Sequence, residues 1–104
     1  NVRQHQMLAL EQARQIAIEQ IAKVFGNPDT FSIIDSTTIV RPYGWVFSYQ
    51  SRRYLESGDE LEMLAGNAPL IVNRFTGAVT VTGTAHPIGH YLTEYELHLP
   101  PGAA

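Results

Sequence analysis

The hydrophobic residues of this chain change their spacing after the first quarter of its length, and this change limits the folds that it can adopt. Apolar residues recur at helical spacing from Ala9 to Val24, while charged and amide side chains lie between them. We therefore predict a helix over residues 3–25, ended by the Gly-Asn-Pro segment at 26–28. From Phe31 onward the spacing becomes two, which is typical of strands.

The alternating segments predict four strands, paired as two antiparallel hairpins. Asp35 interrupts the alternation of the first segment, which indicates a bulge or an exposed strand face. The predicted pairs are residues 31–40 with residues 45–50, and residues 70–73 with residues 79–82.

Three aromatic residues alternate along the second predicted strand: Trp45, Phe47 and Tyr49. Side chains two positions apart in a regular strand point to the same face of the sheet. We therefore predict that these three share one face and that this face packs against the helices. Val46 and Ser48 are expected on the opposite face.

The rest of the chain completes an α+β pattern. Residues 51–68 show no clear period, although Leu61, Met63 and Leu64 could anchor a short helical turn. Pro87 suits the first turn of a closing amphipathic helix. The order helix, two strands, loop, two strands, helix predicts an N-terminal helix and a C-terminal helix packed on an antiparallel sheet of about four strands.

The composition excludes several kinds of protein. A chain of 104 residues, 44% of them hydrophobic, forms one globular domain, which we place at residues 1–104. The absence of cysteine excludes disulfides, iron–sulfur clusters and a cysteine nucleophile. No apolar run approaches the ~20 residues of a membrane span, and no signal-peptide pattern is present, so we expect a cytoplasmic protein that does not bind membranes. Because the chain begins with Asn1 rather than Met, we expect that residues upstream have been processed, cut off or left out, so its targeting is only weakly constrained.

Charge is distributed unevenly along the chain. The residues up to Tyr54 carry a balance of +2 (six basic, four acidic), and the residues after it carry −5 (one basic, six acidic). Four of these acids crowd into the segment without a clear period. Acidic groups in an interface loop attract a basic partner and speed association. We predict a protein-binding segment there, unless it is a plain solvated loop; its residues are Tyr54, Glu56, Asp59, Glu60 and Glu62.

An aromatic stretch at residues 45–54 is flanked by Arg41, Arg52 and Arg53, which could in principle stack and pair with nucleic acid. The net charge of −3 disfavours this reading, because nucleic-acid binding requires a basic surface. Alternating aromatic residues in a strand are more typical of a core.

His86, His90 and Glu94 lie four residues apart on the closing helix and could place three metal ligands on one face. The same spacing arises in any solvated face of an amphipathic helix, and zinc sites usually show a more specific spacing. No nucleophile motif surrounds a serine, and no phosphate-binding glycine loop is present. We therefore predict that the protein is not an enzyme and binds neither metal nor cofactor.

Several short segments together resemble the immunity protein 35 family, also called YrhB-like. Their order and spacing carry the resemblance over roughly residues 7–96. The segments are residues 44–49 (GWVFSY), 53–54 (RY), 66–72 (GNAPLIV), 76–77 (TG) and 83–84 (GT), followed by Pro87 and residues 91–95.

Members of that family are small bacterial proteins, mostly inferred to be immunity proteins of polymorphic toxin systems, which serve competition between bacteria. The resemblance implies that this chain binds and neutralises a cognate toxin domain made by the same cell, through stoichiometric complex formation. One branch has been linked to chaperone-like behaviour, so a small stress protein that binds unfolded clients is the alternative. The resemblance supplies neither catalytic residues nor a set of toxin contacts.

Overall fold

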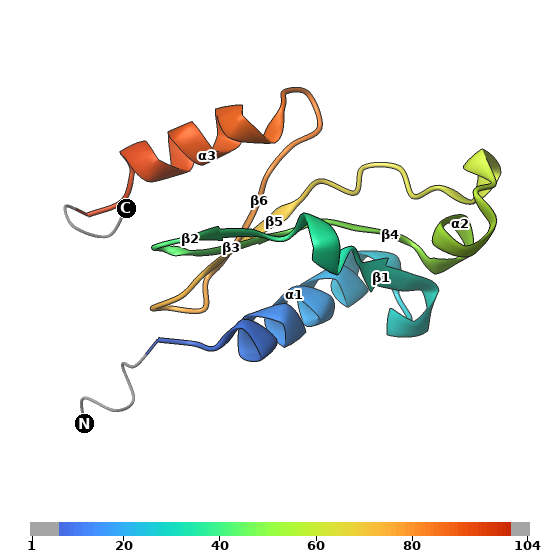
Figure 1. Cartoon of the computed structure of the whole chain (residues 1–104), viewed down its shortest axis with the longest axis horizontal. Helices are drawn as coiled ribbons and strands as arrows, with labels where there is room; N and C mark the ends of the chain where they lie inside the picture. The colour runs from blue at the N-terminus through green and yellow to red at the C-terminus, as the bar shows by residue number, and fades with distance from the viewer. Residues whose placement is uncertain (1–6, 101–104) are drawn as a thin grey trace.

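The computed structural model describes residues 7–100 and has the α+β architecture that the sequence predicts (Figure 1). None of its helices, within that described part, is long and apolar enough to cross a membrane. The elements in chain order are α1 (Leu10–Phe25), the 3₁₀ turn η2 (Pro28–Thr30), β1 (Phe31–Ile33), the 3₁₀ turn η3 (Asp35–Thr37), β2 (Ile39–Arg41), β3 (Gly44–Phe47), β4 (Tyr49–Ser51), α2 (Arg52–Ser57), the 3₁₀ turn η4 (Glu60–Glu62), β5 (Leu70–Asn73), β6 (Val79–Val81) and α3 (Ile88–Leu97).

The first helix is shorter than predicted, because residues 7–9 are not helical. The backbone N–H of Leu8 donates to the carbonyl of Arg74 at 2.8 Å, which ties this segment to the chain after β5. The side chain of Gln12 then accepts from the N–H of the residue before the helix at 2.8 Å and so fixes where α1 starts. The remainder of the predicted N-terminal extension, residues 3–6, lies outside the described residues.

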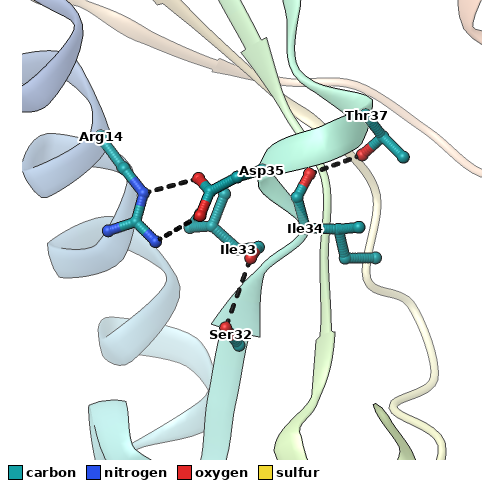
Figure 2. A network of polar contacts seen from close by, with 6 residues as sticks. All are labelled: Arg14, Ser32, Ile33, Ile34, Asp35 and Thr37. Carbon is teal, nitrogen blue, oxygen red and sulfur yellow. Dashed lines mark hydrogen bonds and ion pairs between the residues drawn. The ribbon is translucent and has the colours of Figure 1, made fainter.

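The first predicted hairpin is confirmed, but it is divided into two pairs of strands. β2 pairs with β3 and β1 pairs with β4, and the chain between β1 and β2 forms η3. Figure 2 shows why the chain turns here: Arg14 of α1 holds Asp35 through two hydrogen bonds of 2.8 and 3.0 Å, and the Thr37 hydroxyl donates to the carbonyl of Ile34 at 2.8 Å. The interruption predicted at Asp35 is therefore a helical turn that is bound to α1.

The strands form a four-stranded antiparallel sheet in the order β2-β3-β5-β6 and a two-stranded pair, β1-β4. Because only Ser48 separates β3 from β4, the pair extends the sheet along the same direction (Figure 1). The second predicted hairpin is confirmed as β5 with β6, with Ile71 opposite Thr80.

The two outer helices cover opposite faces of the sheet (Figure 1). As predicted, Trp45, Phe47 and Tyr49 share one face, where they pack in a core with α1. Val46 lies on the other face, in a second cluster with Leu92 of α3. The prediction that both helices cover the aromatic face is therefore wrong: α3 buries the aliphatic face, because strands with apolar residues on both sides need a cover on each.

Gly44 begins β3 directly after the tight turn at the end of β2 and has a φ of 152°. A side chain at this position would collide with the carbonyl of Val72 on the neighbouring strand β5. Only glycine therefore lets β3 approach β5 this closely at the turn.

Candidate partner-binding site

The acidic segment that the sequence predicts as a binding site is a short, ordered projection, which we call the acidic arm (residues 52–62). It consists of α2 and η4 and lies at one end of the molecule (Figure 1). The expectation that this segment is irregular is wrong. The hydroxyl of Ser51 caps α2 by accepting from the N–H of Tyr54 at 3.2 Å, and Gly58 ends the helix with a φ of 73°. A serine before and a glycine after a six-residue run is a helix signal that could have been found in the sequence.

Three of the five predicted binding residues surround one hollow on the acidic arm, with a volume of about 320 Å³. The three are Glu56, Asp59 and Glu62. Arg53 and Ser57, which were not among the predicted residues, complete the lining. Arg53 Nη1 lies 3.8 Å from Glu62 Oε2, and the Arg53 side chain is 81% exposed, so this pair is weak. The hollow therefore keeps a surplus of negative charge.

The other two predicted residues do not line that hollow. Tyr54 is half-buried, and its carbonyl accepts from the N–H of Gly58 at 2.8 Å. Glu60 is exposed at the start of η4. The predicted set is thus contiguous along the arm, but it does not converge on a single point.

Exposed apolar side chains accompany the acids of the arm, a feature that the sequence prediction missed. Leu61 is 92% exposed between two glutamates, and Leu55 and Met63 are 45% and 46% exposed. The short helical turn expected here does form, as η4, but Leu61 does not anchor it; of the three residues proposed, Leu64 is the one that packs against the core. Single exposed apolar side chains are common on protein surfaces, so Leu61 is a candidate contact only together with the acids around it.

Side-chain hydrogen bonds attach the arm to the sheet on both sides. The buried Gln50 accepts through Oε1 from the N–H groups of Ser51 and Leu64, both at 2.7 Å. The amide of Asn67 donates to the carbonyl of Tyr49 at 2.9 Å. These contacts replace a regular strand ladder beside β4, and they hold the arm in one place relative to the core.

The three residues weighed as metal ligands do approach one another on α3. His90 Nε2 lies 3.2 Å from Glu94 Oε1, and the ring centroids of His86 and His90 are 4.1 Å apart. Within residues 7–100 no group of three His, Asp or Glu side chains is arranged to hold a metal ion. That the three bind no metal stays a prediction.

Comparison with known proteins assigns the family. The sequence profile described as Immunity protein 35 matches residues 11–98. This range includes the acidic arm and all of the helices and strands described above, apart from the first residue of α1. The chain therefore belongs to the immunity protein 35 family.

Among curated proteins the chain is similar to the Escherichia coli (strain K12) protein named "Uncharacterized protein YrhB". The two are 46% identical over 54 residues, which is 52% of this chain and 57% of that relative. The match thus spans little more than half of the relative's length. No solved structure matches the chain.

Proposed function

We propose that this chain binds a cognate bacterial toxin domain in a fixed ratio and thereby neutralises it in the cytoplasm of the cell that makes both. The observation that carries the proposal is membership of the immunity protein 35 family over residues 11–98. Neutralisation by a bound protein requires no catalytic group, because a tight complex covers the toxin's active site or its substrate surface.

We place the toxin on the acidic arm, where Glu56, Asp59, Glu60 and Glu62 face basic groups of the toxin. The exposed carboxylates at the rim of such an interface raise the association rate more than they raise the affinity. Tyr54, half-buried at the root of the arm, supplies a rigid aromatic contact of the kind that interfaces favour.

Leu61 is the apolar anchor of this proposed interface. Its side chain is 92% exposed in the free protein, so burial against the toxin removes almost all of its apolar surface from water. Complete burial of a leucine side chain contributes about 1.5–3 kcal/mol. The acids around Leu61 would then favour partners that have both a basic rim and an apolar pocket over partners that lack either feature.

The neighbouring gene identifies the toxin to test: we expect a large secreted protein with a variable C-terminal domain. Co-expression of that domain with this chain should restore growth, and the purified pair should elute as one complex of fixed stoichiometry. Growth arrest despite co-expression would refute the proposal. Suppressed aggregation of unrelated proteins without a fixed-ratio complex would favour the chaperone-like alternative.

Charge neutralisation tests the location of the interface. The double variant Glu56→Gln/Glu60→Gln should slow association with the toxin and weaken its dependence on salt, because rim charges steer encounter. The matched control is Glu11→Gln/Glu19→Gln, which removes two exposed carboxylates from α1 instead. A quadruple variant adds Asp59→Asn and Glu62→Gln to the double variant and removes all four charges. The asparagine introduced at position 59 can still accept the hydrogen bond that Asp59 takes from the Leu61 N–H at 3.0 Å.

The variant Leu61→Ser tests the apolar anchor. It should speed dissociation of the toxin but leave the stability of the free protein unchanged, since the side chain makes little contact there. Leu97→Ser is the matched control, because Leu97 is 77% exposed on α3. If the acidic and leucine variants bind as the wild type does, the toxin binds elsewhere, and Arg41, Arg52 and Arg53 mark the next surface to test.

A further inference from the structure

Within residues 7–100, β6 pairs with β5 alone, so its other edge carries backbone groups without a strand partner. Hydrogen bonds from Asn73 N to Ala78 O (2.9 Å) and from Thr82 N to Pro69 O (3.0 Å) bracket the pairing of β5 with β6. In an antiparallel ladder such bonded pairs recur at every second residue. The N–H and C=O groups of Thr80 therefore point toward β5, and those of the first and last residues of β6 point away from the sheet.

On two other edge strands, β1 and β2, side chains bond the outward carbonyls. On β2, the carbonyl of Val40 accepts from Arg41 Nη1 at 3.1 Å. On β1, the carbonyl of Phe31 accepts from Arg52 Nη2 at 3.0 Å. The carbonyl of Ile33, also on β1, accepts from Ser32 Oγ at 3.3 Å (Figure 2). Among the described residues no such bond closes the outward carbonyls of Val79 and Val81 on β6.

Among the described residues, the short length of β6 is the one protection that its edge shows against pairing with another chain. Its three residues are Val79, Thr80 and Val81, with neither charge nor proline, and Val81 is 57% exposed. Natural sheet edges are blunted by short strands, charged residues, proline, bulges or covering segments. With its outward carbonyls unbonded among the described residues and its side chains uncharged, this edge is able to pair with a partner strand.

A groove of about 470 Å³ lies beside this edge, between the sheet and α3. Because Thr80 is paired with Ile71, its side chain shares the face that α3 covers. The residue of an added strand that lies opposite Thr80 would point the same way. The sheet contributes Ile71 and residues 80–82 to the lining of this groove. The other side is formed by Tyr91, Glu94 and Tyr95 of α3 and by His98 after it, and the lining contains neither Lys nor Arg.

We propose that the edge of β6 takes up an extended segment of a protein partner as an added strand, and that an Arg or Lys of this segment lies in the groove against Glu94. The carboxylate of Glu94, whose Oε1 also lies 3.2 Å from His90 Nε2, is exposed beside two tyrosine rings and so suits a cationic head on an apolar stem. A second copy of this chain fits less well, since its Thr80 would lie opposite Thr80 and would leave the groove empty. The inference concerns a surface away from the acidic arm and does not depend on the toxin proposal.

A synthetic peptide tests the proposal with the intact protein. The probe is acetyl-Thr-Val-Arg-Val-Thr-amide, titrated into isotope-labelled protein and followed by NMR. Its central arginine lies opposite Thr80, so its two valines exchange backbone hydrogen bonds with Val79 and Val81. We expect the amide signals of Val79 and Val81 to shift and their hydrogen exchange to slow.

Two matched peptides separate backbone pairing from charge. N-methylation of both valines removes the donors that face β6 and should abolish binding. Replacement of the arginine by glutamate should weaken binding about tenfold, because the charge would then oppose Glu94. Equal binding of all three peptides would overturn the proposal.

Variants of the protein complete the test. Glu94→Gln should erase the preference for the arginine peptide, whereas Glu19→Gln on α1 should leave it intact. Val81→Pro removes only an outward donor and should block binding; if this variant does not fold, the N-methylated peptide decides the question. A concentration-dependent dimer of the free protein that Val81→Pro dissociates would overturn the proposal in favour of a second copy.

Discussion

The hydroxyl of Tyr43 donates a hydrogen bond to Oε2 of Glu96 at 2.8 Å and thereby joins the turn before β3 to α3 across 53 positions of sequence. The Tyr43 ring also lies 5.0 Å from the ring of Tyr95, centroid to centroid. α3 has one buried residue, Leu92, among its ten. The tyrosine contacts therefore contribute much of what holds this helix against the sheet.

Tyr43→Phe should lower the free energy of unfolding by about 1–2 kcal/mol, because it leaves a half-buried carboxylate without its donor. Urea unfolding followed by the fluorescence of Trp45 measures the loss. Tyr54→Phe on α2 is the control and should change stability by less than about 0.5 kcal/mol. A Tyr43→Phe variant as stable as the wild type would show that the bond contributes nothing.

The same tyrosine should make the fold sensitive to alkali. Burial, and then the hydrogen bond to Glu96, raise the pKa of Tyr43 above its ordinary value of 10.0. The unfolded chain therefore releases this proton first, so the stability is intact below about pH 10 and falls as the pH rises above it. Urea unfolding at a series of pH values should show a shallower fall for Tyr43→Phe. Part of the slope should remain, because burial also raises the pKa of Tyr49.

Phe47→Ala should cost about 3–5 kcal/mol, since it removes an aromatic side chain from the core. Phe47 is 0% exposed and packs on the face that α1 covers. Val24→Ala, at a position that is 70% exposed on α1, is the control and should lie within about 0.5 kcal/mol of the wild type. A loss below ~1 kcal/mol for Phe47→Ala in denaturant would contradict the packing described here.

Gln50→Leu should both destabilise the protein and loosen the acidic arm. The substitution leaves two backbone N–H groups without the acceptor that they share, at a cost on the order of 2–3 kcal/mol. Hydrogen exchange at the amide of Leu64 should accelerate beyond the change in global stability. Gln15→Ala, an exposed position on α1, is the control. Unchanged exchange at Leu64 would mean that other contacts hold the arm.

Protein purified without added metal should contain no stoichiometric zinc, iron or manganese. The polar face of α3 accounts for the four-residue spacing of His86, His90 and Glu94. In addition, His90 Nε2 already lies 3.2 Å from Glu94 Oε1. Elemental analysis checks this directly. A stoichiometric metal that is lost in His90→Ala would instead indicate a metal-dependent activity.

Much of the candidate site could be predicted from local sequence. The clustering of acids and the position of Tyr54 beside them follow from the order of residues alone. That Glu56, Asp59 and Glu62 surround one hollow depends on the caps supplied by Ser51 and Gly58, which set the direction of α2 and η4. The exposure of Leu61 depends on which residue of this segment packs against the core, and that residue is Leu64.

The sequence by itself determined the order of the elements and the shared face of Trp45, Phe47 and Tyr49, because hydrophobic spacing is a local property of the chain. Only the tertiary structure decided that the two outer helices lie on opposite faces of the sheet. That choice depends on contacts between distant residues, such as Tyr43 with Glu96, whose pairing no local spacing encodes. For the same reason the open edge of β6 becomes visible only when the strands are assembled and their outward groups can be compared.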